Sequence, residues 1–357
     1  MESDNRVWGR SNNPYDVTRT VGGSSGGEAC IVAAGGSPFG LGSDIGGSIR
    51  LPAFFNGVFG HKSSPGLVPN EGQYPVPLPG VRLLGTGPLA RRAKDLPLLL
   101  SVLSGRPVDA GPADATGLRV LVLEGDGSTP VQAELLDAQA RAADALARRG
   151  ARVSTVTLQG LRGVFEMWTT AMDGASDTKF AELLGQGTAL NPAVELARFV
   201  AGRSPYTFPA VGLLALEALV GKLDVRKPKV RAAAEALERE VLSLLGDDAV
   251  LLYPPYPEVA PRHGRPMLFP TRFTFTGLFN VLGLPVTQVP MGLSREGLPL
   301  GVQVASRPGA DARTLAVAKW LEEDAGGWVW PEVKAAASST RRASRFTPWR
   351  REREARA

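Results

Sequence analysis

Two glycine- and serine-rich segments carry the residues best suited to catalysis. Residues 22–27 read Gly-Gly-Ser-Ser-Gly-Gly, and residues 44–50 read Asp-Ile-Gly-Gly-Ser-Ile-Arg. A serine hydroxyl attacks a carbonyl only when a neighbouring base removes its proton, and N–H donors must meet the negative charge that develops on the carbonyl oxygen. Glycines allow successive N–H groups to converge on one point. We therefore interpret the second segment as an oxyanion hole that ends in its own nucleophile, formed by Ile45, Gly46, Gly47 and Ser48.

Each segment alone has a plainer interpretation. Residues 22–27 are as typical of a flexible loop or a phosphate cradle, although a phosphate loop of the Walker type needs a Gly-Lys-Ser/Thr sequence that is absent. Residues 44–48 alone are more typical of a tight turn than of a catalytic one. The two segments together, in this order and at this spacing, argue against chance.

Together the segments resemble the amidase signature family, in which a Gly/Ser-rich loop precedes a Gly-Gly-Ser turn followed by Ile and Arg. The resemblance implies that Ser48 is the nucleophile and that Ser24 follows a cis peptide bond and relays protons. It also implies that the amides of Ile45, Gly46, Gly47 and Ser48 bind the oxyanion. No metal and no organic cofactor are implied.

Three further regions narrow the resemblance to the fatty-acid amide hydrolases, and most closely to their second vertebrate type. They are residues 8–16, residues 51–62, and the pair 283–288 and 297–303, so that the similarity runs from about Trp8 to Pro331. It implies hydrolysis of a small-molecule amide with an apolar acyl chain through an acyl-serine intermediate. It also leaves room for contact with a membrane surface.

The family's catalytic lysine has no counterpart in this chain. In the family it lies on a central strand well before the relay serine, but none of the 23 residues before Ser24 is a lysine. Arginine cannot act as the base because its pKa is too high. Lys62 is the first lysine, and we interpret residues 60–62 as a loop. His61, without a carboxylate neighbour there, and His263 are interpreted as structural or surface residues.

We therefore expect the chain to be part of a longer amidase whose N-terminal region, with the lysine, it lacks. The alternative is a catalytically inactive amidase-like fragment or pseudoenzyme that acts only as a binding protein.

Residues 118–158 predict one β-α-β unit. Residues 118–123 and 153–158 read as strands, and Thr129 is expected to cap the intervening helix, with Pro130 at its first position. Val131, Leu135, Ala138, Ala142 and Leu146 recur at helical spacing, which predicts a buried face. Such a unit indicates a parallel or mixed sheet covered by helices.

The remaining pattern predicts a single large mixed β-sheet flanked by helices on both faces. Further helices are expected at 28–34, 48–55, 207–222, 228–246 and 311–322, and strands at 39–42, 249–253, 286–291 and 300–304. The run 208–220 is apolar apart from Glu217, which is typical of a core helix or of the wall of an acyl-chain channel. We expect an amidase core over residues 1–333 and a basic, disordered tail over 334–357.

The composition argues against a nucleic-acid-binding protein, a zinc protein and a membrane-spanning protein. The net charge of +5 comes from the tail, which carries +6, so the body is near neutral and no nucleic-acid partner is expected. One cysteine, Cys30, and two histidines make a zinc site improbable and indicate a reducing compartment. Without a signal peptide or a spanning segment, the chain as given is expected in the cytoplasm, with membrane association left open for a longer form. The pattern predicts no oligomeric state.

Overall fold

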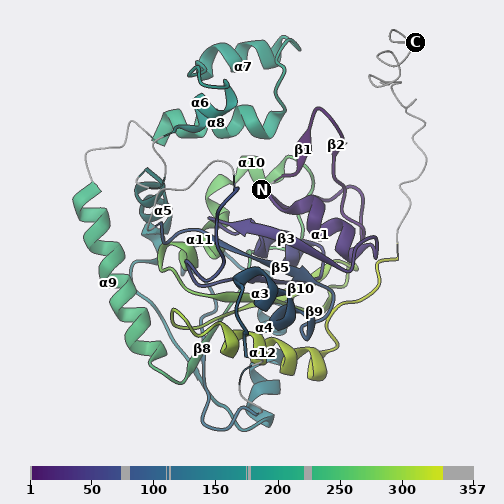
Figure 1. Cartoon of the computed structure of the whole chain (residues 1–357), viewed down its shortest axis with the longest axis vertical. Helices are drawn as coiled ribbons and strands as arrows, with labels where there is room; N and C mark the ends of the chain where they lie inside the picture. The colour runs from purple at the N-terminus through teal and green to yellow at the C-terminus, as the bar shows by residue number, and fades with distance from the viewer. Residues whose placement is uncertain are drawn as a thin grey trace.

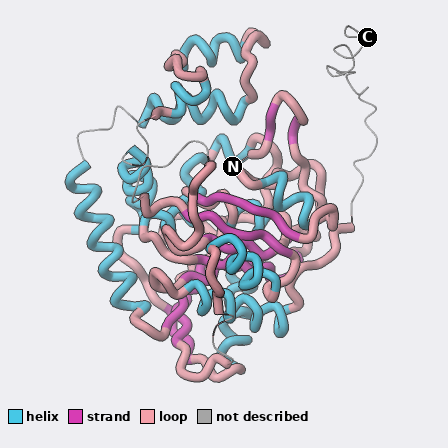
Figure 2. Tube along the Cα trace, in the orientation of Figure 1, coloured by secondary structure: helices cyan, strands magenta, loops and turns pink. Residues whose placement is uncertain are grey.

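The computed structural model is built around an eight-stranded mixed sheet with the strand order β3-β5-β4-β9-β10-β8-β6-β7 (Figures 1 and 2). It describes residues 2–73, 81–109, 111, 114–173, 175, 178–220 and 227–332, so the basic segment 334–357 lies outside the described residues. A two-stranded hairpin, β1–β2, stands apart from the sheet. The strands are β1 (Asp4–Asn5), β2 (Gly9–Arg10), β3 (Phe39–Asp44), β4 (Phe59–Lys62), β5 (Gly85–Ala90), β6 (Arg119–Val122), β7 (Arg152–Thr155), β8 (Ala249–Tyr253), β9 (Val286–Leu293) and β10 (Pro299–Ala305).

Helices cover both faces of the sheet, as the sequence predicted. Helices α3, α4 and α12 pack on one face, α5, α9 and α11 on the other, and α1 and α2 pack against β3 and β4. The helices are α1 (Gly26–Ala33), α2 (Arg50–Phe55), α3 (Asp95–Ser104), α4 (Ala133–Arg148), α5 (Val164–Asp173), α6 (Phe180–Leu184), α7 (Pro192–Val200), α8 (Phe208–Val220), α9 (Lys227–Leu245), α10 (Arg265–Leu268), α11 (Thr274–Val281) and α12 (Asp311–Ala325). Among the described residues no helix is long and apolar enough to cross a membrane.

The predicted β-α-β unit is present, with one correction. Strands β6 and β7 are parallel, and Leu135, Ala138, Ala142 and Leu146 of the predicted face are buried, whereas Val131 precedes the helix and is only partly buried. Thr129 does not cap the helix, because its hydroxyl donates to Asp126. The helix begins at Ala133 after Gln132, whose side chain accepts a hydrogen bond from the amide of Val259.

The segment 60–62 is a strand, not the loop that the sequence suggested. β4 lies between β5 and β9, and both of its polar side chains are buried. His61 also has a carboxylate neighbour, because its Nε2 lies 3.1 Å from Asp311 Oδ1. Nδ1 of the same ring lies 2.9 Å from Thr287 Oγ1. Partners on distant elements therefore allow a polar sequence to form a central strand.

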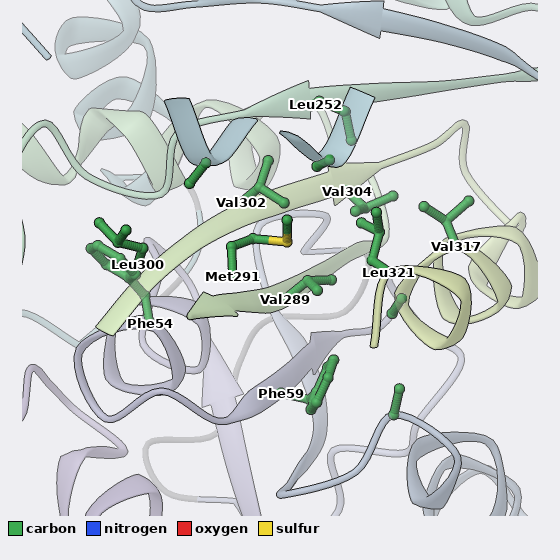
Figure 3. Packing of buried hydrophobic residues seen from close by; sticks show 14 of the residues in the cluster. Phe54, Phe59, Leu252, Val289, Met291, Leu300, Val302, Val304, Val317 and Leu321 are labelled. Atoms are coloured by element: carbon green, nitrogen blue, oxygen red, sulfur yellow. The ribbon is translucent and has the colours of Figure 1, made fainter. Parts of the chain in front are cut away.

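The main core lies between the sheet and α3, α4 and α12. Figure 3 shows Val289, Met291, Val302 and Val304 from neighbouring strands packed towards Val317 and Leu321 of α12. Burial of a side chain of this kind contributes about 1.5–3 kcal/mol. β10 is buried along its whole length and β9 along all but its last two residues, so both strands are covered by helices on both faces.

Helices α6, α7 and α8 form a layer at one end of the molecule (Figure 1). The sole charged residue of α8, Glu217, accepts hydrogen bonds from the amides of Phe180 and Ala181 at the start of α6. Val211 and Leu214 of α8 are buried, whereas Phe208 and Leu213 are exposed. The apolar helix therefore lies outside the three buried clusters of the described residues.

Replacing Leu135 of α4 by alanine should lower the free energy of unfolding by about 2–5 kcal/mol, because it leaves a cavity beneath the sheet. Leu98 on α3 is 67% exposed, and its alanine variant should change stability by less than about 0.5 kcal/mol. Urea unfolding of both variants measures the difference. Equal losses would contradict the packing described here.

Candidate active site

The segment 44–50 forms a turn between the end of β3 and the start of α2. Gly47 has a φ of +115°, and a Cβ atom there would collide with the side chain of Thr276. Both the backbone conformation and the space require glycine at this position. Thr276 Oγ1 also donates to the carbonyl of Gly46 at 2.9 Å, so α11 holds the turn from the outside.

A buried ion pair closes this turn. Arg50 donates to both carboxylate oxygens of Asp44, from Nη2 at 2.9 Å and from Nε at 3.0 Å, and both side chains are fully buried. The same carboxylate accepts from the amides of Gly47 at 2.7 Å and Ile49 at 3.1 Å. Asp44 therefore pairs with the arginine and organises the backbone between them.

The other hydrogen-bond partners of the Arg50 guanidinium lie more than 220 residues away from it in the sequence. Its remaining donors reach the carbonyl of Thr276 at 2.9 Å, Gln303 Oε1 at 2.8 Å and Asn280 Oδ1 at 2.6 Å. Arginine has five N–H donors, and all five are used. Asn280 also donates to Asp44 Oδ1 at 2.9 Å, which makes the network continuous.

The network keeps Asp44 ionised. Burial by itself would raise the pKa of this carboxyl, but the charge and hydrogen bonds of Arg50, with Lys62 and Asn280, lower it to about 2. The pair is thus charged throughout the neutral range.

The two predicted segments meet at this turn. The amide of Ser25 donates to the carbonyl of Ser48 at 3.1 Å, which joins the Gly/Ser-rich loop to the turn. The Gly23–Ser24 peptide bond is cis, the bond type that the family resemblance implies for this serine. Ser24 is exposed and Ser48 is partly buried, so both lie where a small molecule can approach them.

The predicted oxyanion donors are not equivalent. The amide of Gly47 is already bonded to Asp44. The amides of Ile45, Gly46 and Ser48 have no protein acceptor within the residues that the structure describes. These three N–H groups are therefore the ones left to meet a developing negative charge.

Aromatic side chains border the turn. Trp168 of α5 donates from Nε1 to the carbonyl of Ile45 at 2.7 Å. Its ring packs edge-on against Phe273, with the centroids 4.8 Å apart, and Phe165 packs on Phe273 in turn. Trp168 therefore fixes one side of the turn, and its partly buried ring places apolar surface beside it.

Lys62 lies fully buried behind the turn. Its ammonium donates to the carbonyl of Leu284 at 3.0 Å and to that of Ser63 at 3.3 Å. Burial, followed by the charge of Arg50, lowers its pKa from 10.5 to about 7. A Cβ at Gly85 would lie 2.7 Å from Lys62 Cγ, so that glycine provides the space for the side chain.

The described residues contain no cluster of three or more His, Cys, Asp or Glu side chains suited to a metal ion. Two surface cavities, of about 670 and 350 Å³, are lined by neither Ser24 nor Ser48. The candidate site is accordingly an open turn, distinct from both cavities.

Comparison with known proteins agrees with this architecture. The family model for amidases matches residues 1–315. The chain therefore belongs to the amidase signature family. It is similar to fatty-acid amide hydrolase 2 of Homo sapiens, with 45% identity over 92% of this chain and 65% of the relative. The chain thus spans just under two thirds of that relative's length.

More distant relatives show the same fold. A glutamyl-tRNA(Gln) amidotransferase subunit of Deinococcus radiodurans is 33% identical over 87% of this chain and 69% of that protein. The crystal structure of the corresponding Thermotoga maritima protein covers 92% of this chain and 73% of its own, with a TM-score of 0.74 and 26% identity. A 6-aminohexanoate cyclic dimer hydrolase covers 93% and 74%, with a TM-score of 0.72 and 26% identity.

The structure brings the two predicted serine segments together, but the sequence did not indicate the groups that hold the turn. Thr276 and Asn280 lie in a segment without a motif, and the matched region 297–303 gave no role to the side chain of Gln303. Trp168 falls in a helix that was not predicted. Asp44 and Arg50 flank the glycines six residues apart, and their opposite charges are the one local signal that could have indicated the ion pair.

Replacing Arg50 by methionine should lower the free energy of unfolding by about 3–5 kcal/mol, because it leaves the Asp44 carboxylate buried without its partner. Arg50→Lys should recover little of this loss, since an ammonium has three donors for five acceptors. Arg239 and Glu235 form an exposed pair at 4.0 Å, and Arg239→Met should cost less than about 1 kcal/mol. Similar urea midpoints for the Arg50→Met and Arg239→Met variants would contradict this description.

The lowered pKa of Lys62 also predicts how stability varies with pH. Between about pH 7 and 10.5 the unfolded chain holds a proton that the folded chain has released. Stability should therefore rise with pH across this window, by up to about 1.4 kcal/mol per unit, relative to a Lys62→Met variant. Unfolding free energies of the two proteins, measured from pH 6 to about pH 10, give the difference. A difference that does not change with pH would show that the amine is not buried in this way.

Proposed function

We propose that this chain carries the catalytic turn of a serine-dependent amidase that hydrolyses fatty-acid amides, with Ser48 as the nucleophile. The observation that carries the proposal is the turn itself. The amides of Ile45, Gly46 and Ser48 have no protein acceptor among the described residues. The buried ion pair of Asp44 and Arg50 fixes the backbone that carries them. Preorganised donors of this kind stabilise an oxyanion without reorganising during the reaction.

In the proposed reaction Ser48 Oγ forms a bond to the amide carbon while its proton passes to the Ser24 hydroxyl, which gives its own proton to the base of the relay. The amides of Ile45, Gly46 and Ser48 receive the oxyanion. When the C–N bond breaks, Ser24 returns a proton to the departing nitrogen, and the acyl group remains on Ser48 as an ester. Water then hydrolyses the ester to release the acid.

The relay also needs a base that takes the proton from Ser24. The family resemblance assigns it to a lysine, and none precedes Ser24 in these 357 residues. Lys62 is bonded to the carbonyls of Leu284 and Ser63. We therefore assign Lys62 a structural role and leave the base of the relay unassigned.

The proposed substrate class rests on similarity and on the aromatic border. Fatty-acid amide hydrolase 2 is named for fatty-acid amides, and Trp168 with Phe273 and Phe165 supplies apolar surface beside Ile45 and Gly46. Each CH₂ group of an acyl chain that is buried contributes about 0.8 kcal/mol. A long chain would therefore supply most of the binding energy and would favour contact with a membrane surface, where such amides gather.

The absent lysine favours one alternative, a chain that binds fatty-acid amides without hydrolysing them. Loss of a general base costs about 10²–10⁴-fold in rate. The two functions share a binding site and differ in whether Ser48 becomes acylated.

Incubation of the purified chain with the primary amide of a long-chain fatty acid separates the two functions. Hydrolysis should release ammonia and form an acyl adduct on Ser48 that mass spectrometry detects. Ser48→Ala should abolish both signals, and Ser24→Ala should lower the rate by about 10²–10⁴-fold. Ser43→Ala, one residue before Asp44, serves as the control. Saturable binding of the amide without ammonia or adduct would refute hydrolysis by this chain and support the binding function.

A further inference from the structure

The position of the Ser24 hydroxyl depends on the backbone of the Gly/Ser-rich loop, residues 22–27. Within the part of the chain that the structure describes, this hydroxyl has no hydrogen-bond partner, and the side chain is exposed. The amide of Ser25 anchors the loop on the carbonyl of Ser48. The start of the loop is held differently, by a network of buried polar side chains.

The hydroxyl of Thr20 links the start of the loop to a buried carboxylate. Thr20 is fully buried, and its Oγ1 accepts a hydrogen bond from the amide of Gly22 at 3.0 Å and donates to Glu2 Oε2 at 3.0 Å. A hydroxyl has one proton, and an ionised carboxylate can only accept. The carboxylate of Glu2 therefore orients the Thr20 hydroxyl so that a lone pair faces the amide of Gly22, two residues before Ser24.

The carboxylate of Glu2 is fixed by residues from a distant part of the sequence. Its Oε1 accepts from the amide of Gly264 at 2.9 Å, and its Oε2 lies 3.4 Å from Nδ1 of His263. Nε2 of the same ring lies 3.3 Å from the carbonyl oxygen of Val17. The side chains of His263 and Glu2 are only 10% and 3% exposed. Burial raises the pKa of the Glu2 carboxyl, but hydrogen bonds, that from His263 first, outweigh it and hold the pKa below its usual value.

Two backbone segments, 18–20 and 261–263, run antiparallel beside the loop. The amide of Thr20 donates to the carbonyl of Pro261 at 2.9 Å, and a bridge pairs the middle residues of the two segments. The pairing fixes the segment that carries His263. The imidazole ring therefore belongs to the framework of the loop and is not a free surface group.

Glu2 and its neighbour Ser3 also contact the loop directly. Ser3 Oγ donates to the carbonyl of Gly22 at 2.9 Å. A Cβ atom at Gly23 would lie 2.7 Å from the carbonyl oxygen of Glu2, and one at Gly26 would collide with the Ser3 side chain. Both glycines thus make room for these two residues. The loop is held by Glu2 through its backbone as well as through its carboxylate.

We propose that Thr20, oriented by Glu2 and His263, is a positioning residue that sets where the Ser24 hydroxyl lies for proton transfer. Misplacing a catalytic group by about 1 Å can cost about 10²-fold in rate. A reactive hydroxyl without a side-chain contact of its own needs a backbone that is held firmly. Among the described residues, the Thr20 hydroxyl is the side-chain group that holds the amide of Gly22.

Other contacts should keep the loop folded when the Thr20 hydroxyl is removed. The carbonyl of Thr20 accepts from Asn13 Nδ2 at 3.1 Å, and that of Val21 from Asn56 Nδ2 at 2.9 Å. Neither bond uses the hydroxyl, so the expected effect is local. The importance for catalysis rests on the proposed function of Ser24 as the proton relay, whereas the placement of the loop does not depend on hydrolysis.

Amide hydrogen exchange of residues 20–27, measured by mass spectrometry, tests the placement of the loop without relying on hydrolysis. Thr20→Val removes the hydroxyl at nearly constant volume and should speed exchange in this segment by about tenfold. Thr20→Ser keeps a hydroxyl and should exchange like the original chain. Thr18→Val is the matched control, because the Thr18 side chain is exposed and its hydroxyl donates to Asp16. It should leave exchange of the segment unchanged.

A second variant tests the link to the carboxylate. Glu2→Gln keeps the volume but places an amide beside the Thr20 hydroxyl, so it should also speed exchange. The double variant Glu2→Gln/Thr20→Val should add little to either single change, because both act through one hydroxyl. Fully additive effects would contradict the proposed link.

Kinetics with the primary amide of a long-chain fatty acid tests the catalytic consequence. Thr20→Val should lower kcat by about 10–10²-fold and leave KM within about twofold, and Thr20→Ser should restore kcat. If the original chain releases no ammonia, the proposed hydrolysis is refuted, and hydrogen exchange alone decides the role of Thr20. Equal exchange of residues 20–27 in Thr20→Val and in the original chain would overturn the proposal.

Discussion

The buried pair of Asp44 and Arg50 is the interaction on which the candidate site depends. Removing two charges from water is costly, and their mutual attraction compensates only when the remaining donors and acceptors are also satisfied. Here every guanidinium N–H has an acceptor, and the carboxylate also receives backbone amides. The pair therefore links β3, α2, α11 and β10 around one turn, and it sets the geometry of the amides beside Ser48.

Side chains from several surrounding elements hold this turn in place. Thr276 of α11 lies so close to the left-handed Gly47 that a Cβ atom at position 47 would collide with it. Trp168 of α5, which packs against α11, fixes the carbonyl of Ile45. Because a turn has no internal repeat of hydrogen bonds, such outside contacts replace the regular pairing that holds helices and strands.

Elements of the fold could be predicted from the sequence where a local pattern specifies them. The strand Ala249–Tyr253 and the buried face of α4 follow from apolar runs and helical spacing, and both are present as predicted. The mixed sheet followed from the β-α-β unit at residues 118–158, and the proximity of the two serine segments was implied by the family resemblance. The strand at residues 60–62 could not be predicted, because His61 becomes a strand residue only through Asp311 and Thr287. The predicted start of α4 was wrong for a similar reason. The side chain of Gln132, just before the helix, accepts a hydrogen bond from the distant Val259 and not from a residue of its own segment.

The reach of the Arg50 network along the chain has a consequence for synthesis on the ribosome. Arg50 needs Thr276, Asn280 and Gln303, so the turn cannot take its final form until almost all of the described chain has been translated. The ribosome adds about 5–20 residues per second, so some tens of seconds pass between the synthesis of Ser48 and that of Gln303. During that interval the nascent chain displays Ser24 and Ser48 without the ordered turn between β3 and α2. The turn is thus completed only when the fold that encloses it can form.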